Sequence, residues 1–239
     1  MKRLCSVCAR GGSKGVPNKN IRPLLGKPLL IHSLDQARQS GLFDCIVVSS
    51  DSNEILQLAE EWGVDHAIER PEELATDTAA KLPVIQHCFL TAETLSGMTF
   101  DSAVDLDATS PLRNQADLKG VVNLLESHDS TTNVITGTPA RRSPYFNLIE
   151  LDESGIVHLS GKRQNIDGTI VRRQDAPPCF DMNASIYAWW RDSLLKARDV
   201  IQSSTRLYVM PEERSVDIDS ELDFRWVEFL MNDEQKSAQ

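Results

Sequence analysis

The stretch LCSVCARGGSKGVPNKN, residues 4–20, decides the fold of this chain. It joins an apolar run, Leu4 to Ala9, to a loop rich in glycine, lysine and asparagine, and a helix-like segment from Leu29 to Gln39 follows. A strand, a loop and a helix in this order are typical of the opening unit of an α/β domain. Glycines let backbone N–H groups approach a ligand closely, and the basic side chains of the loop suit phosphate. The simpler alternative is a solvated surface loop, and the loop matches neither a Walker A motif nor GxGxxG.

The same alternation continues along the chain. We expect strands at 46–49, 64–68, 103–107, 133–137, 184–189 and 206–210. We expect helices from 51 or 52 to 62, and near 79–95, 114–127, 191–202 and 220–231, before a frayed polar tail at 232–239. This order predicts a Rossmann-like α/β fold with a mainly parallel sheet flanked by helices.

The pattern changes between residues 139 and 182. This part is punctuated by prolines and turn residues, and its segments Tyr145 to Ile149 and Gly155 to Leu159 are typical of a β-hairpin. We interpret it as a small β-rich lobe inserted into a single domain that spans 1–239.

Charge and composition exclude several classes of protein. The 239 residues carry a formal net charge of −10, which argues against a nucleic-acid-binding surface. Residues 1–34 nevertheless contain seven Lys or Arg and no Asp or Glu, so a local positive site suits a small polyanion. The chain shows no signal peptide and no apolar run of about 18 residues, so we expect a cytoplasmic protein without a membrane span.

Cysteine and histidine give no sign of a metal centre. The five cysteines are odd in number, and Cys5 and Cys8 point to opposite faces of a strand, which favours buried core thiols over metal or redox chemistry. The five histidines are scattered and form neither a metal-ligand spacing nor a hydrolase triad.

Five blocks along nearly the whole chain resemble one family, the nonulosonate (sialic acid-type) cytidylyltransferases, also called CMP-sialic acid synthetases. The blocks are Arg-x-x-Ser-Lys-Gly-x-x-x-Lys-Asn at 10–20, Arg70-Pro71 with Leu74 to Thr78, Ala108 to Arg113, Asn183 to Tyr187, and Asp217 to Asp223. Their order and spacing both match, which is far more specific than any single block.

The resemblance implies how CTP is bound and what is done with it. The implied triphosphate contacts are Arg10, Ser13, Lys14 and Lys19, and the implied nucleotide contacts are Asn20 and Arg70. The anomeric hydroxyl of a nine-carbon 2-keto sugar acid would attack the α-phosphorus of CTP and expel pyrophosphate. Catalysis would then consist mostly of positioning and charge neutralisation, with Lys19 as a catalytic residue.

Asp217 and Asp219 form the expected metal site. In an extended segment both carboxylates lie on one face, about 7 Å apart. Carboxylates and phosphate oxygens are the usual ligands of Mg²⁺, and the family carries an aspartate pair at this place, so we expect Mg²⁺ or Mn²⁺ as cofactor. The alternative is that Asp219 or Ser220 merely caps the helix at 220–231.

The sugar side of the site is also implied by the resemblance. Arg173, or its neighbour Arg172, would bind the carboxylate of the sugar, and Asn183 and Tyr187 would lie nearby, although Tyr187 also fits a core aromatic. Asp107 stands where many members that act on N-acetylneuraminate have glutamine. Our hypothesis is that Asp107 accepts a hydrogen bond from an amide N–H or a hydroxyl of the sugar.

The same resemblance implies a class of sugar substrate and an oligomeric state. The blocks at 79–83, 139–147 and 181–187 resemble the bacterial branch that acts on diamino nonulosonates such as legionaminic acid. The resemblance also implies a homodimer formed through the lobe at 139–182. A Kdo (3-deoxy-octulosonate) cytidylyltransferase and a catalytically silent nucleotide- or sugar-binding module stay open as alternatives.

Overall fold

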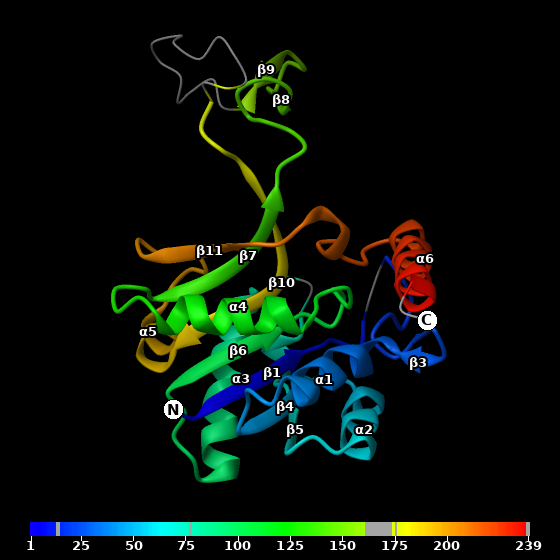
Figure 1. The fold of residues 1–239 in the computed structure, drawn as a ribbon, viewed down its shortest axis with the longest axis vertical. Coiled ribbons are helices and arrows are strands. Elements are labelled where there is room, and N and C mark those ends of the chain that lie inside the picture. Colours follow the sequence, from blue (N-terminus) through cyan, green and yellow to red (C-terminus); the bar gives the residue numbers. More distant parts are fainter. Residues whose placement is uncertain (13–14, 77, 161–173, 175, 238–239) are drawn as a thin grey trace.

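A seven-stranded sheet lies at the centre of the computed structural model, which describes residues 1–12, 15–76, 78–160, 174 and 176–237 (Figure 1). Its order is β11–β7–β10–β6–β1–β4–β5. The strands are β1 (Arg3–Cys8), β4 (Cys45–Ser50), β5 (His66–Glu69), β6 (Ser102–Leu106), β7 (Asn133–Pro139), β10 (Phe180–Trp190) and β11 (Thr205–Val209). Only β10 runs antiparallel to its neighbours in this sheet. The prediction of a mainly parallel, Rossmann-like sheet is confirmed.

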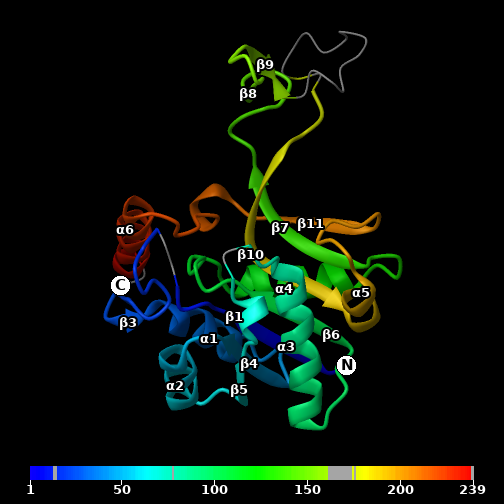
Figure 2. The same ribbon diagram turned by 180° about the vertical axis from the view of Figure 1, so that it is seen from behind.

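Helices cover both faces of the sheet. Helices α1 (Leu29–Ser40), α2 (Asn53–Trp62) and α4 (Gln115–Glu126) bury their apolar residues against one face. Helices α3 (Lys81–Ser96) and α5 (Arg191–Lys196) cover the other face, which Figure 2 shows from behind. Cys5 packs in the first of these cores and Cys8 beside the second, so the two thiols do lie on opposite faces of β1.

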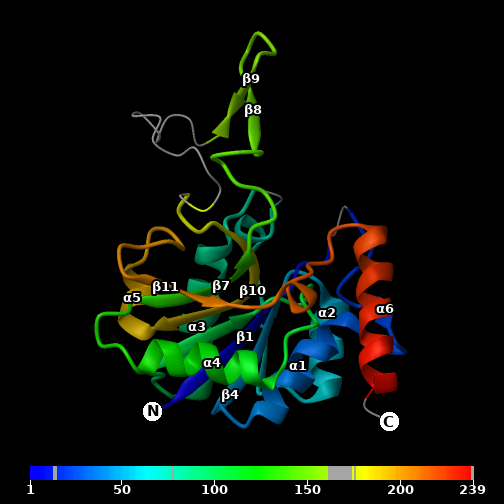
Figure 3. The same ribbon diagram turned by 45° about the horizontal axis from the view of Figure 1, so that its top comes forward.

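A third, smaller core lies beside the sheet and joins the two ends of the chain. It contains Val16 of the first loop, Ile218, and Phe224 of α6 (Glu221–Ser237). The short strands β2 (Pro23–Leu24) and β3 (Lys27–Pro28) pair next to it, and Figure 3 shows α6 standing alongside this region. Because Ile218 is fully buried here, the residues on either side of it are held close to the first loop.

The described part of the lobe projects away from the body of the molecule (Figures 1 and 2). Beyond the sheet, β7 and β10 continue as a two-stranded ribbon in which Phe180 pairs with Pro139. The ribbon carries a small hairpin of β8 (Ile149–Leu151) and β9 (Val157–Leu159). Since β10 returns from the lobe along the path of β7, it has to enter the sheet antiparallel.

The predicted strand at 145–149 is wrong for most of its length. Residues 144–147 form a turn in which the backbone N–H groups of Phe146, Asn147 and Leu148 all donate to the carbonyl oxygen of Ser143. The Asn147 side chain closes the turn by accepting from the Ser143 N–H at 2.7 Å. Local side-chain hydrogen bonds of this kind compete with strand pairing.

Three further boundaries differ from prediction. The helix expected at 191–202 ends at Lys196, where the Gln86 amide donates to the carbonyl oxygens of Leu194 and Ala197 and so terminates it. Strand β10 begins at Phe180 rather than 184, and α6 continues to Ser237 instead of ending at 231. None of the helices in the described ranges is long and apolar enough to cross a membrane.

Candidate active site

A cleft of about 430 Å³ opens where β1 and β6 end. The carboxyl ends of parallel strands meet at one edge of the sheet, which is where α/β folds hold their ligands. The cleft is lined by Cys8, Ala9, Arg10, Gly15, Lys19, Asn20, Arg70, Leu74, Thr76, Ala79, Lys81, Val84, Asp107, Ala108, Thr109, Asp217 and Asp219. Cys8, which we expected in the core, therefore contributes to the wall of the cleft.

Asn20 and Arg70 build the wall nearest β1 and β4. The Asn20 side chain is buried and donates from Nδ2 to the Arg10 carbonyl oxygen at 2.9 Å. Its Oδ1 is buried without a hydrogen-bond partner among the described residues, so it is an acceptor available to a ligand. Arg70, also buried, donates to the Ser49 carbonyl oxygen at 2.8 Å and so ties the end of β5 to β4.

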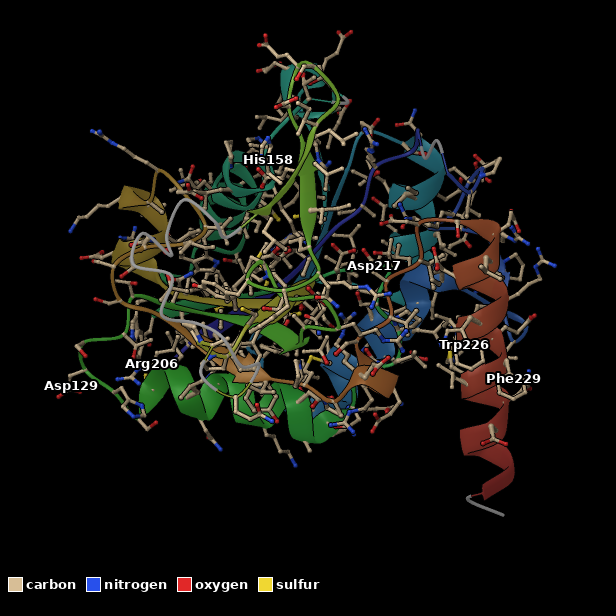
Figure 4. The ribbon with its side chains drawn as sticks, turned by 90° about the horizontal axis from the view of Figure 1, so that it is seen from above. Asp129, His158, Arg206, Asp217, Trp226 and Phe229 are labelled. Atoms are coloured by element: carbon tan, nitrogen blue, oxygen red, sulfur yellow. The ribbon has the colours of Figure 1, made fainter. Side chains whose placement is uncertain are left out.

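The first loop touches the segment that carries the aspartate pair. The Lys19 ammonium donates to the Ile218 carbonyl oxygen and lies 3.3 Å from Asp219 Oδ1. Gly15 approaches so closely that a Cβ atom there would lie 2.0 Å from the Asp219 carbonyl oxygen. Together with the burial of Ile218, these contacts bring Asp217 and Asp219 to the cleft, and Figure 4 shows Asp217 between the sheet and α6.

Ser220, rather than Asp219, caps α6. The Ser220 N–H donates to Asp223 Oδ2 at 2.8 Å, and the Asp223 N–H donates back to Ser220 Oγ at 3.3 Å. This reciprocal arrangement is a capping box. The Asp219 carboxylate takes no part in it, and its side chain is 80% exposed.

Thr109 connects two carboxylates of the cleft. Its hydroxyl lies 2.8 Å from Asp107 Oδ1 and also contacts Asp217 Oδ1. A single hydroxyl proton can be donated to only one of them. Burial, and then the negative charge of Asp107, raises the pKa of Asp217. A cation at Asp217 would relieve this concentration of negative charge.

The aspartate pair alone provides few protein ligands. Within the described ranges, no three His, Cys, Asp or Glu side chains are grouped so that they could hold a metal ion. Asp217 and Asp219 are hard oxygen ligands of the kind that Mg²⁺ takes when waters and substrate phosphates complete its shell. The residues therefore fit Mg²⁺ bound together with a nucleotide.

Lys81 is a residue of the cleft to which the sequence analysis gave no role. It is the first residue of α3, and its ammonium donates to Asp107 Oδ2 at 2.6 Å. It also lies 3.3 Å from Oδ2 of the fully buried Asp105 and 4.7 Å from the centre of the Tyr187 ring. Burial would lower the pKa of Lys81, but Asp107 and Asp105 hold it above its usual range. A charged residue inside the apolar strand 102–106 was the signal for this cluster in the sequence.

Arg113 is a second such residue, and it fixes the backbone beneath the cluster. It is 2% exposed and donates to the carbonyl oxygens of Asp107 at 2.6 Å and Ser185 at 2.7 Å. Its Nε also donates to Gln36 Oε1 at 3.0 Å. Burial lowers the pKa of Arg113 to about 10, so it stays charged at neutral pH. Arg113 thus holds the Asp107 backbone without facing the cleft.

The structure brings seven of the predicted site residues together. These are Arg10, Lys19, Asn20, Arg70, Asp107, Asp217 and Asp219. Neither Asn183 nor Tyr187 lines the cleft. The Asn183 amide donates to Ser215 Oγ at 2.9 Å inside the fold, and Tyr187 is 3% exposed in the core beneath Lys81. Ser13, Lys14, Arg172 and Arg173 lie outside the described residues.

Known proteins resemble this chain over its whole length. The family model described as cytidylyltransferase matches residues 4–152. "Post-translational flagellin modification protein B" of Campylobacter coli is 44% identical, over 98% of this chain and 97% of its own. "CMP-N,N′-diacetyllegionaminic acid synthase" of Campylobacter jejuni is also 44% identical, over 96% of this chain and 94% of its own. A solved structure of a CMP:2-keto-3-deoxy-manno-octonic acid synthetase with CTP is 16% identical, with a TM-score of 0.70 over 98% of this chain and 100% of its own, which shows the shared fold.

Proposed function

This chain belongs to the cytidylyltransferase family, and on that premise we propose that it couples CTP to N,N′-diacetyllegionaminate or a closely related nine-carbon 2-keto sugar acid. The observation that carries the proposal is the 44% identity, across 94% of the relative's length, to the Campylobacter jejuni synthase. The enzyme is a nucleotidyltransferase. We place the reaction in the cytoplasm.

The wall formed by the first loop suits the nucleotide. Arg10 and Lys19 offer cationic donors for the phosphates, and we extend this role to Ser13 and Lys14 of the same loop. The buried Asn20 Oδ1 can accept a hydrogen bond from the sugar or base of CTP, beside Arg70. Asn20 and Arg70 are held by hydrogen bonds to the backbone before the ligand arrives, which lowers the cost of binding.

The reaction is a displacement at phosphorus. The anomeric oxygen of the sugar acid forms a bond to the α-phosphorus of CTP while the bond to the bridging oxygen of the β-phosphate breaks. The leaving pyrophosphate takes the electron pair, and the anomeric proton passes to solvent. The chain's own contribution is to hold the two substrates in line and to neutralise the phosphate charge with Lys19 and Arg10.

A divalent cation is part of this proposal. Asp217 and Asp219 would hold Mg²⁺ or Mn²⁺, which fits their hard oxygen ligands and the crowded negative charge around Asp217. When bound, the ion would neutralise charge on the phosphates of CTP. Asp217 and Asp219 themselves are oriented by Thr109 and by the buried Ile218 between them.

The lobe completes the proposal. We assign the lobe at 139–182 to homodimer formation, because the strands of its described hairpin, β8 and β9, expose apolar side chains to solvent. We also assign the carboxylate of the sugar to Arg173, with Arg172 as the alternative. Neither nucleic acid nor a membrane is a partner in this function.

The test is pyrophosphate release from CTP and Mg²⁺ with a panel of sugar acids. The panel contains N,N′-diacetyllegionaminate, its pseudaminate stereoisomer, N-acetylneuraminate and Kdo, each beside a reaction without sugar. We expect release that depends on a nonulosonate, with the diacetyllegionaminate giving the highest kcat/KM. Release with Kdo alone would make the chain a Kdo cytidylyltransferase. CTP binding without release from any sugar would make it a silent binding module.

The variant Asp217→Asn tests whether this activity arises at the proposed site. The substitution removes the carboxylate charge with little change in size, so we expect kcat to fall on the order of 10²-fold or more. Asp129→Asn is the matched control, because Asp129 is exposed and lies far from Asp217 in Figure 4. Full activity of Asp217→Asn would show that the Asp217 carboxylate is not needed for catalysis.

A further inference from the structure

The cleft has a second wall that the nucleotide contacts leave unused. Four described cations line the cleft, and three of them, Arg10, Lys19 and Arg70, belong to the first loop and to the ends of β1, β4 and β5. Lys81 is the fourth, and its contacts are instead with β6 and β10. If CTP binds at the wall that carries Arg10, Lys19 and Arg70, Lys81 faces the acceptor sugar.

The contacts of Lys81 leave donor capacity for a ligand. An ammonium has three N–H groups. One donates to Asp107 Oδ2 at 2.6 Å, while Asp105 Oδ2 lies 3.3 Å away as an ion-pair partner without a hydrogen bond among the described residues. The side chain lines the cleft and is 26% exposed, so a further N–H can be offered to a ligand. The two carboxylates and the Tyr187 ring hold the ammonium in one place.

Local charge decides which substrate group this N–H can take. Asp105 and Asp107 lie against the Lys81 ammonium, and the buried Arg113 guanidinium beside Asp107 brings the cluster to two acidic and two basic side chains. The cluster therefore has no excess positive charge with which to hold a further anion, such as the carboxylate of the sugar. A neutral oxygen acceptor needs no such charge, and the carbonyl oxygen of an N-acyl group is the strongest such acceptor on an N-acylated sugar acid.

We propose that Lys81 donates a hydrogen bond to an N-acyl carbonyl oxygen of the acceptor sugar and so determines specificity, while Asp107 is a positioning residue that holds Lys81. This inference rests on the proposed function and deepens it. It also revises our hypothesis for Asp107. Oδ1 of Asp107 already accepts from the N–H of Thr109 at 3.0 Å and lies 2.8 Å from its hydroxyl, and Oδ2 accepts from Lys81. The group that contacts the sugar is therefore Lys81.

The experiment compares two acceptors in wild type and in Lys81→Met. One acceptor is N,N′-diacetyllegionaminate, and the other has the same skeleton with hydroxyls in place of both acetamido groups. We expect wild type to prefer the diacetyl sugar, and Lys81→Met to lose roughly tenfold or more of that preference, as for one hydrogen bond from a charged donor. The KM for the diacetyl sugar should rise, and the KM for CTP should stay within about twofold.

Two additional variants distinguish a loss of sugar specificity from a folding defect. Lys81→Met leaves Asp105 buried without its counter-charge, so the double variant Lys81→Met/Asp105→Asn removes that charge as well. It should show the same loss of preference at wild-type thermal stability. Lys196→Met is the control, because Lys196 is 79% exposed on α5 and distant from the cleft.

The outcomes separate this inference from the proposed function. If wild type releases no pyrophosphate with either sugar, the proposed function fails and the inference fails with it. If wild type is active but does not discriminate between the sugars, or if the folded Lys81 variants keep its preference, only the inference is overturned. A rise in the KM for CTP without a rise in that for the sugar would also overturn it, by assigning Lys81 to the nucleotide.

Discussion

The place of Asp107 in the site could be predicted from the sequence, but its partner could not. Its place before the Ala108 to Arg113 block marked it as a departure within the family pattern, and the structure does place it in the cleft. Its partner could not be predicted, because Lys81 lies 26 positions away and meets it only when α3 packs against the sheet. A pattern along the chain identifies residue types, whereas the pairing of charges depends on the packing of elements.

The Asp107–Lys81 pair also makes a prediction about stability and pH. Burial alone would raise the pKa of Asp107, but Lys81 and the Thr109 hydrogen bonds hold it well below its usual range. A carboxyl whose pKa is lower in the folded state stabilises the fold above its unfolded pKa, near 3.8, and this contribution is lost as the pH falls below that value. We therefore expect acidification from about pH 6 to about pH 2 to lower the free energy of unfolding more in wild type than in Asp107→Asn.

Urea denaturation of the two proteins at a series of pH values measures this difference. Asp129→Asn is the control, since exposed Asp129 shows no such contacts, and its curve should follow that of wild type. Equal acid sensitivity of Asp107→Asn and wild type would contradict the assignment of a strong Asp107–Lys81 pair.

At the scale of elements, the cleft depends on the contact between the first loop and the segment at 217–219. Val16 and Ile218 share the third core, and Gly15 lies against the Asp219 backbone. We expect Gly15→Ala to separate the two segments, because its new methyl group would lie 2.0 Å from the Asp219 carbonyl oxygen. A displacement of this size between phosphate-binding and metal-binding groups should lower kcat/KM for CTP roughly tenfold or more.

Gly12→Ala is the matched control for this prediction. It lies in the same loop, but a Cβ atom there would meet nothing within 4 Å. Steady-state kinetics with varied CTP should show a clearly smaller loss for Gly12→Ala than for Gly15→Ala. Equal effects would mean that loop flexibility, rather than contact with Asp219, limits the reaction.

The elements that the sequence predicted well are those whose pattern is set by the sheet itself. The alternation of buried strands and amphipathic helices from β1 to β7 follows from packing on both faces. The errors occur where one distant or local polar side chain overrides the pattern. The Gln86 amide ends α5 early, and the Ser143 turn replaces a predicted strand. The site was predictable in its charged blocks, but Lys81 and Arg113 acquire their roles only through long-range contacts.

At the scale of the whole molecule, two exposed apolar surfaces compete as the interface of a dimer. The hairpin surface of the lobe consists of Leu151, Ile156 and Val157, which are 68%, 59% and 53% exposed. The other surface lies on α6, where the rings of Trp226 and Phe229 stack with their centres 5.4 Å apart (Figure 4). The described hairpin projects from the body (Figure 1), and its exposed apolar side chains lack partners among the residues that the structure describes.

We therefore predict that the lobe, and not α6, holds the homodimer together. The double variant Leu151→Asp/Val157→Asp places two charges on the hairpin surface, where burial without partners is costly, and should shift the protein from dimer to monomer in sedimentation velocity. Leu222→Asp adds one charge to α6, at a side chain that is 70% exposed, and should leave the dimer intact. Both variants should keep the thermal stability of the isolated fold, because neither site is buried in the chain. A wild-type monomer, or dissociation by Leu222→Asp alone, would refute the assignment of the lobe as the interface.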